Sequence, residues 1–223
     1  MRQRKIKEID KKINEFEKFL VREPEKQRGN WRGAFGKDSS APEVFAEIGC
    51  GKGRFITGQA SRNPEKLYIG FEGNETVIYR ALQKVALLDE SNHAIASHIK
   101  FCSSYIYEPR DIFEENELDG MFLNFSDPWP KTRHEKRRLT QQEYINGYVH
   151  SISKGGILEF KTDNEDFFRY SLENFKKEKG FDLDTVIEDI QKSEQKEYNV
   201  ETEYEHKFNN LRRKIKFLRV IKV

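Results

Sequence analysis

A carboxylate, an aromatic turn and a block of positive charge lie side by side in NFSDPWPKTRHEKRRLT, residues 124–140. Asp127 follows an apolar, strand-like run and begins the sequence Asp127-Pro128-Trp129-Pro130. The basic side chains of the next eight residues are Lys131, Arg133, Lys136, Arg137 and Arg138, with His134 among them. Because clustered Lys and Arg bind phosphates, this block predicts a polyanionic partner beside a carboxylate that is able to do chemistry.

The charge of the whole chain says less than its distribution. The net charge is only +2, but a second basic cluster lies within the first twelve residues and includes Arg2, Arg4 and Lys5. Acidic residues gather instead in 108–119 and 181–205. We interpret the two basic clusters as contacts to nucleic-acid phosphates, and the alternative is that they are ordinary solvated faces.

A glycine-rich loop follows another apolar run in VFAEIGCGKGRF. Glu47 precedes Gly49, Gly51 and Gly53, and glycines at a strand-to-helix turn let the backbone approach a ligand closely. The spacing is not the dinucleotide fingerprint, because the third glycine comes one residue early. Nor is it a Walker loop, because Lys52 is followed by glycine. The pattern resembles the first motif of class I S-adenosylmethionine-dependent methyltransferases, and a tight turn without a ligand is the alternative.

Glu72 ends the next predicted strand, in LYIGFEG. A carboxylate about 20 residues beyond such a loop accepts hydrogen bonds from ribose hydroxyls, which indicates an adenosine-containing ligand. NAD and S-adenosylmethionine both fit that role. Glu47 favours S-adenosylmethionine, because a carboxylate there suits a cationic ligand and opposes a pyrophosphate.

The elements that must position these residues alternate along the chain. Apolar runs predict strands at 44–48, 67–71, 99–102, 120–125 and 157–160, and helical patterns cover 52–62, 74–88, 141–153 and 166–179. This alternation predicts an α/β, doubly wound, Rossmann-like and mostly parallel sheet with helices on both faces. The C-terminal KIKFLRVIKV alternates with period two, so we expect an antiparallel strand or one near an edge.

Before this sheet, residues 3–20 have the apolar spacing of an amphipathic helix, and 22–40 are a polar, glycine-containing connector. We therefore expect a basic N-terminal helix and connector in 1–40 and one catalytic domain in 41–223. The chain has 223 residues, long enough for one sizeable core.

Composition narrows the setting of the protein. No apolar run approaches the roughly 18 residues of a membrane span, and the N-terminus lacks the apolar region of a secretory signal. The two cysteines, Cys50 and Cys102, cannot build a disulfide framework, and no Cys/His spacing predicts a metal site. We expect a cytoplasmic protein without a metal, and its state as monomer or homodimer stays open.

Five segments in order resemble the tRNA (guanine-N7-)-methyltransferase family. They are WRGAFG at 31–36, EIGCGKGRFI at 47–56, SDPWPKTRHEKRRL at 126–139, FKTDNEDFFRYSL at 160–172 and TEYEHKF at 202–208. The resemblance implies methyl transfer from S-adenosylmethionine to N7 of a guanine in the variable loop of tRNA. Two positions depart from the family pattern: Ser126 replaces a proline, and Tyr105 lies where an acid or Asn near the adenine is usual.

The resemblance also implies roles for single residues. Glu47, Glu72 and the three glycines would hold the cofactor, with Tyr105 near its adenine, and Asp127 would lie between cofactor and target base. The residues that would contact tRNA or its guanine are Lys131, Asp163, Thr202 and Glu205. Phosphate contacts are expected from Arg133, Lys136, Arg137 and Arg138, with Arg2, Arg4 and Lys5 as a second group.

Guanine N7 carries a lone pair in the ring plane, so its methylation requires no prior deprotonation. The enzyme must place N7 in line with the methyl donor, and a fixed carboxylate such as Asp127 stabilises the charge that moves to the base. Trp129 is expected either to stack on an extruded base or to be a core aromatic. Two other functions remain open: an exocyclic amino methyltransferase of nucleic acid, and a non-catalytic tRNA-binding protein.

Overall fold

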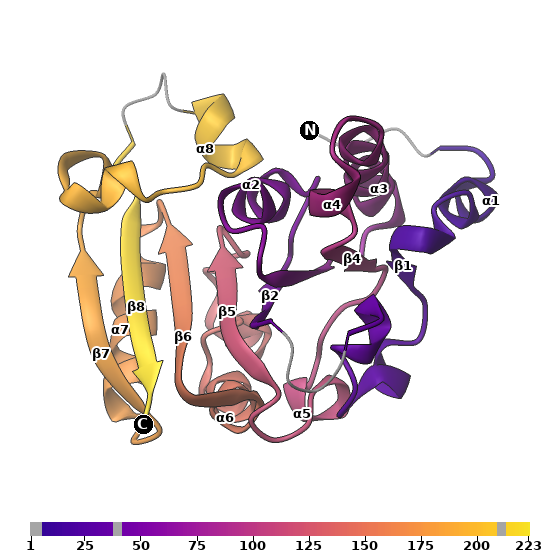
Figure 1. The fold of residues 1–223 in the computed structure, drawn as a ribbon. Helices are drawn as coiled ribbons and strands as arrows, with labels where there is room; N and C mark the ends of the chain where they lie inside the picture. Colours follow the sequence, from indigo (N-terminus) through magenta and orange to yellow (C-terminus); the bar gives the residue numbers. More distant parts are fainter. Residues whose placement is uncertain (1–5, 38–41, 209–212) are drawn as a thin grey trace.

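A mixed sheet organises the computed structural model, which describes residues 6–37, 42–208 and 213–223. In these residues the strand order is β1-β4-β3-β2-β5-β6-β8-β7 (Figure 1). The strands are β1 Leu20–Val21, β2 Val44–Ile48, β3 Leu67–Phe71, β4 Ile99–Cys102, β5 Leu118–Asn124, β6 Ile152–Thr162, β7 Phe181–Ile187 and β8 Lys216–Lys222. Strand β8 is antiparallel to both neighbours, and the pairs from β1 to β6 are parallel. The predicted doubly wound fold is confirmed.

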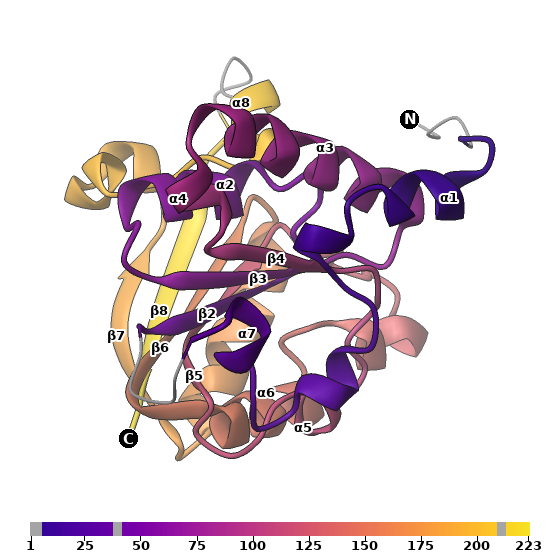
Figure 2. The same cartoon turned by 45° about the vertical axis from the view of Figure 1, so that its right-hand side comes forward.

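Helices cover both faces of the sheet (Figure 2). They are α1 Ile9–Asn14, α2 Arg54–Arg62, α3 Glu75–Ser91, α4 His93–Ala96, α5 Pro109–Ile112, α6 Gln142–Ser151, α7 Glu165–Lys177 and α8 Glu203–Phe208. Alternate residues of β2 separate the two faces, since Ala46 belongs to the core under α5, α6 and α7 and Phe45 to the core under α1, α2, α3 and α4. The short parallel strands are buried on both sides, which explains their continuous apolar runs.

The predicted strands and helices of the central sheet are found within a few residues of their expected bounds. The C-terminal strand is antiparallel, as expected, and β7 at its side is an edge strand that the sequence did not reveal. In β7 the burial pattern is mostly exposed, so the apolar signal of a buried strand is absent.

The prediction of one helix over 3–20 was wrong in the part that the structure describes. Helix α1 ends at Asn14, a 3-10 turn follows at Glu17–Phe19, and Leu20–Val21 then pair with β4. The edge of β4 offers unpaired backbone groups, and pairing with them overrides the helical spacing of the apolar side chains. Residues 1–5, and with them Arg2, Arg4 and Lys5, lie outside the described residues.

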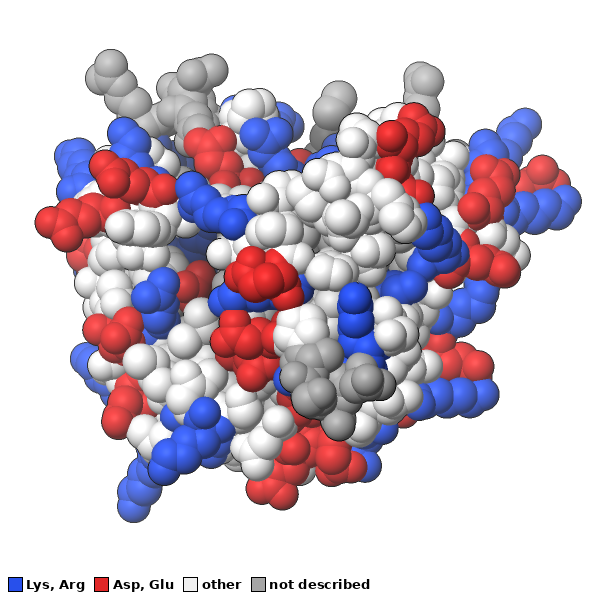
Figure 3. Space-filling model, viewed as in Figure 1, with Lys and Arg blue, Asp and Glu red and all other residues white. Residues whose placement is uncertain are grey.

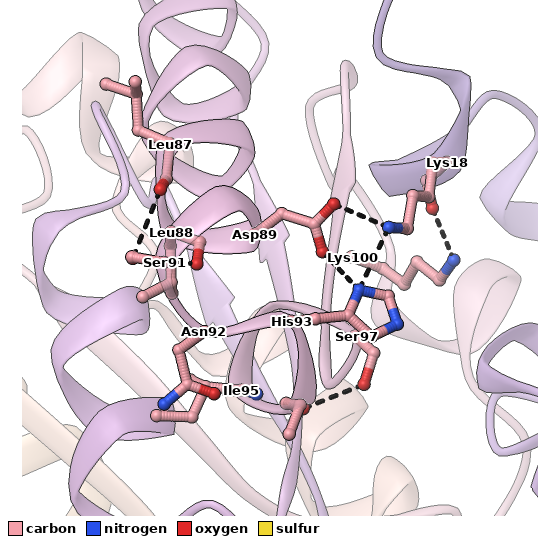
Figure 4. Close-up of polar contacts among 11 residues, drawn as sticks. Lys18, Leu87, Leu88, Asp89, Ser91, Asn92, His93, Ile95, Ser97 and Lys100 are labelled. Carbon is pink, nitrogen blue, oxygen red and sulfur yellow. Dashed lines mark hydrogen bonds and ion pairs between the residues drawn. The ribbon is translucent and has the colours of Figure 1, made fainter.

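Charged contacts fasten this N-terminal segment to α3 and α4 (Figure 4). Lys18 Nζ donates to Asp89 Oδ2 at 2.6 Å, and Asp89 Oδ1 lies 2.6 Å from His93 Nδ1. The hydrogen bonds from Lys18 and His93 hold the pKa of Asp89 below its usual value. Farther along, Trp31 is fully buried in the core and donates through Nε1 to Ile112 O at 2.9 Å. The division of the chain at residue 40 stays a prediction.

Charges of both signs are interspersed on the face shown in Figure 3, with uncharged surface between them. None of the helices in the described ranges has the length and apolar character to cross a membrane. Nor does the described part of the chain contain three or more His, Cys, Asp or Glu side chains placed to hold a metal ion.

Candidate active site

The glycine loop between β2 and α2 has the left-handed backbone that its composition permits. The φ angles of Gly49, Gly51 and Gly53 are +79°, +58° and +75°. A Cβ at Gly49 or Gly51 would meet nothing within 4 Å, whereas one at Gly53 would lie 3.0 Å from Ala81 Cβ. The first two glycines therefore present backbone to open space, and the third packs the loop onto the core.

A cavity of about 330 Å³, the glycine-loop cavity, lies beside this loop. Its lining includes Glu47, Gly49, Gly51, Asn124, Phe125, Thr202 and Tyr204. Glu47 is 2% exposed, and its Oε1 accepts from Asn124 Nδ2 at 2.9 Å. Within the described ranges, Glu47 Oε2 and Asn124 Oδ1 are buried without a hydrogen-bond partner. Two acceptor atoms at a cavity wall suit a ligand that brings N–H donors.

Burial sets the electrostatics of Glu47. It raises the pKa of this carboxyl to about 8, although the hydrogen bond from Asn124 and the charge of Lys161 act in the opposite direction. A carboxyl in this state binds a cationic group by releasing its proton, because the partner then favours the charged form.

Glu72 lies at the end of β3, next to the glycine loop. Its Oε1 accepts a hydrogen bond from the backbone N–H of Asn74 at 2.8 Å. Burial raises the pKa of Glu72, while hydrogen bonds from the amides of Asn74 and Gly51 lower it and the charge of Asp127 raises it further. These interactions bring the predicted ribose carboxylate, the loop and Asp127 into one region at the carboxyl ends of the strands.

Helix α8 lies above the upper ends of β5 and β6, beside α2 (Figure 1). Thr202 and Glu205 form a capping box at its start: Glu205 N donates to Thr202 Oγ1 at 3.1 Å, and Thr202 N donates to Glu205 Oε2 at 2.9 Å. Glu203 Oε1 accepts from Arg54 N at 2.9 Å and from Lys84 Nζ at 2.5 Å. Helix α8 thus covers the glycine-loop cavity and is tied to the first turn of α2.

A buried ion pair holds α8 from below. Lys161 Nζ lies 3.2 Å from Glu205 Oε2, and the two side chains are 2% and 0% exposed. Lys161 also donates to Asn199 Oδ1 at 2.9 Å and to Val200 O at 3.0 Å, and Asn199 Nδ2 donates to Glu205 Oε1 at 2.9 Å. Both oxygens of Glu205 are engaged here, so the structure does not present this carboxylate to a base, and its predicted contact with guanine stays a prediction.

A second cavity, the Asp127 cavity, has a volume of about 270 Å³. It is lined by Phe125, Ser126, Asp127, Pro128, Thr162, Asp163, Asn164, Tyr204 and Arg213. Asp127 is exposed, whereas the Asp163 side chain is 15% exposed and accepts from Tyr204 Oη at 2.9 Å and Arg213 at 2.7 Å. The structure therefore brings the two predicted aspartates to one cavity. Ser126 Oγ is buried there without a partner among the described residues, and nothing explains why serine stands at this position.

The basic block divides into four exposed side chains and one, Arg138, that is partly buried. Lys131, Arg133, Lys136 and Arg137 are exposed, as a phosphate-binding surface requires. Arg138 instead donates to Pro128 O at 3.0 Å and to Trp129 O at 3.1 Å, and its guanidinium lies 4.3 Å from the Tyr170 ring centroid. Arg138 therefore holds the turn next to Asp127. Trp129 is half-buried under the Arg137 guanidinium at 4.9 Å and is not part of the core.

Tyr105 is 61% exposed and does not line the glycine-loop cavity. Its ring lies over Gly73, where an added Cβ would come within 2.3 Å of it. A contact between Tyr105 and a cofactor stays a prediction. Lys161, Asn124 and Glu203, by contrast, belong to the site and were not predicted from the sequence.

Comparisons with known proteins agree with this geometry. The model of the family described as "Putative methyltransferase" matches residues 41–218. Among solved structures, an antibiotic-related methyltransferase superposes with a TM-score of 0.57 at 21% identity, over 81% of this chain and 87% of that one. The 16S rRNA methyltransferase KamB gives 0.58 at 12% identity, over 83% and 90%. The fold and site therefore define a methyltransferase of the class I, Rossmann-like type.

Relatives with higher identity narrow this class. The tRNA (guanine-N(7)-)-methyltransferase of Streptococcus uberis is 41% identical over 209 residues, 94% of each chain. That of Halalkalibacterium halodurans is 40% identical over 190 residues, 85% of this chain and 81% of the relative. The chain belongs to the tRNA (guanine-N(7)-)-methyltransferase family.

Proposed function

We propose that this protein transfers a methyl group from S-adenosylmethionine to N7 of a guanine in the variable loop of tRNA. The observation that carries the proposal is the adjacency of two cavities with different chemistry. Phe125 and Tyr204 line both the glycine-loop cavity and the Asp127 cavity, so the two adjoin through these residues. A transferase needs such adjacent sites for donor and acceptor, because the reacting atoms must lie about 3 Å apart and in line.

The residues of the glycine-loop cavity fit S-adenosylmethionine. Glu47 Oε2 and Asn124 Oδ1 offer acceptors for the ammonium of the aminoacyl group. Gly49 and Gly51 leave room for the ligand where a side chain would project, and Glu72 lies at the strand end where a ribose diol is held. When bound, S-adenosylmethionine supplies a methyl group on a cationic sulfur, and no residue of this chain forms a covalent bond in the transfer.

Asp127 and Asp163 have different roles toward the target guanine. Asp127 is exposed at the cavity and close enough for its charge to raise the pKa of Glu72, so it lies near the donor side. There it stabilises the positive charge that guanine gains at N7. Asp163 is suited to accept hydrogen bonds from guanine N1–H and N2–H₂. Thr202 and Glu205 contribute by fixing α8 over the donor cavity, and a direct contact of either with RNA stays a prediction.

Four exposed basic side chains are proposed to bind tRNA phosphates: Lys131, Arg133, Lys136 and Arg137. They follow Asp127 directly, so phosphates bound there lie close to the base that enters the cavity. Such contacts give affinity and position the RNA, whereas the aspartates select the base. Arg138, the fifth residue of this block, acts through the turn that it holds. A cytoplasmic location fits this substrate.

Methyl transfer to an unmodified tRNA transcript tests the proposal. Wild-type protein with labelled S-adenosylmethionine is expected to label the tRNA, and Asp127→Ala to lose most of the turnover while it still binds the tRNA. Equal loss of binding and turnover in Asp127→Ala would make Asp127 a structural residue. Binding of tRNA by a wild-type protein that shows no cofactor binding would favour the non-catalytic alternative.

A further inference from the structure

Two stacked rings line both cavities. The ring centroids of Phe125 and Tyr204 are 4.8 Å apart, and the interplanar angle is 26°. Phe125 follows β5 and Tyr204 belongs to α8, so the stack joins the end of the sheet to the helix that covers the glycine-loop cavity. Both residues line both cavities, so the stacked rings lie where the two cavities adjoin.

The two rings are held in different ways. Phe125 is fixed by its backbone, which has a φ of +51° and donates through its N–H to Lys161 O at 2.8 Å. A left-handed backbone is unfavourable for phenylalanine and persists only where its surroundings enforce it. Tyr204 is fixed at its far end, where its hydroxyl donates to Asp163 Oδ2 at 2.9 Å. Rotation of the Tyr204 side chain thus requires the loss of a hydrogen bond, whereas in Phe125 the backbone, not the ring, has the hydrogen bond.

We infer that Tyr204 is an internal gate between donor and acceptor cavities, latched by its hydroxyl on Asp163, and that the incoming guanine releases the latch. This inference rests on the proposed function. Guanine carries two N–H donors on its N1/N2 edge, which replace the tyrosine hydroxyl on the Asp163 carboxylate. Once released, the Tyr204 ring rotates away from Phe125 and leaves N7 open to the donor side.

The latch adds selectivity between purines. Adenine presents an unprotonated N1 at the same edge, so it offers the carboxylate a lone pair where guanine offers a proton. Adenine therefore does not replace the tyrosine hydroxyl on the carboxylate, and the gate stays closed to it. Arg213 also donates to Asp163 Oδ2, at 2.7 Å, and holds the carboxylate in place while its other partner is exchanged.

Tyr204→Phe tests the latch, because it keeps the stacked ring and removes the hydroxyl. The matched control is Tyr107→Phe, whose parent side chain is 80% exposed. Binding of unmodified tRNA is measured on the protein saturated with S-adenosylhomocysteine, so no methyl transfer takes place. A second tRNA carries adenine in place of the target guanine.

Tyr204→Phe is expected to bind the guanine tRNA about three- to tenfold more tightly than wild type, as one released hydrogen bond allows. Binding of the adenine tRNA should stay within about twofold of wild type, because adenine does not displace the hydroxyl, and S-adenosylhomocysteine affinity should also stay within about twofold. Tyr107→Phe should match wild type in all three. Unchanged or weaker tRNA binding by Tyr204→Phe overturns the gate. Absence of guanine N7 methylation by the wild type would instead overturn the proposed function, and the two failures are distinct.

Discussion

Lys161 and Glu205 form a buried ion pair, 3.2 Å from Nζ to Oε2, that joins the end of β6 to α8. Because α8 covers the glycine-loop cavity, this ion pair connects the sheet to the helix that lies over the candidate cofactor site. The pair lies among further hydrogen bonds from Asn199 and the backbone of Thr202, which satisfy the remaining lone pairs of the carboxylate. Its physical role is therefore to position α8.

Lys161→Met is expected to destabilise the protein by about 3–5 kcal/mol, since it leaves Glu205 buried without its counter-ion. Urea unfolding measures this loss, and calorimetry should show weaker S-adenosylmethionine binding because α8 is released. The double variant Lys161→Met/Glu205→Gln should recover part of the stability. A single-variant loss below about 1 kcal/mol would show that the pair does not hold α8.

Glu47 should make cofactor binding release a proton. Its pKa of about 8 in the free protein leaves it largely protonated at pH 7, and an ammonium partner favours the carboxylate. Calorimetry at pH 7 in buffers of different ionisation enthalpy should detect release of close to one proton. Glu47→Gln should bind more weakly and release none. Equal proton release from both proteins would assign the proton to another group.

The same carboxyl should influence stability in a definite direction. Its folded pKa is raised above the unfolded value, so the unfolded chain loses this proton first as the pH increases. Stability of the free protein should therefore fall from about pH 4.5 to about pH 8, by up to about 1.4 kcal/mol per unit from this group. Urea unfolding across that range should show a shallower fall for Glu47→Gln. Parallel curves for the two proteins would contradict the raised pKa.

A comparison of Gly51→Ala with Gly36→Ala distinguishes the cost of backbone strain from the loss of space for the ligand. Gly51 and Gly36 both have a positive φ, +58° and +67°, and a Cβ at either would meet nothing within 4 Å. Both alanine variants should lose about 1 kcal/mol of stability or somewhat more. Only Gly51→Ala should also weaken S-adenosylmethionine binding, by about tenfold or more, because its methyl projects into the cavity. Similar cofactor affinities in the two variants would remove Gly51 from the binding surface.

Arg137 and Arg138 should differ although they are neighbours. Arg137→Ala should weaken tRNA binding and reduce the slope of log affinity against log salt by about 1, since it removes one phosphate contact. Arg138→Ala should chiefly lower turnover, because the Pro128-Trp129 turn beside Asp127 loses two hydrogen bonds. Binding titrations at several salt concentrations and single-turnover kinetics distinguish them. Identical behaviour of the two variants would contradict the division.

Periodicity and glycine spacing predicted the central sheet and the loop, because both are dictated by short segments. Features that depend on contacts between distant segments could not be predicted in this way. Leu20 has the spacing of a helical residue, but it pairs with β4. Nothing in the sequence distinguishes Lys161 from the other charged residues, although it is 2% exposed. Its burial depends on Asn199 and Glu205, which are far along the chain. The Thr202-x-x-Glu205 spacing is that of a capping box, so the sequence did contain a signal for the start of α8.

The central claim is methyl transfer to guanine N7 from the glycine-loop cavity. The most direct test is to incubate the wild-type protein with unmodified tRNA and labelled S-adenosylmethionine, digest the product and identify the methylated nucleoside by mass spectrometry against standards. We predict 7-methylguanosine from a variable-loop position, and its loss in Asp127→Ala. A methyl group on an exocyclic amine, or on any base other than guanine, would contradict the account.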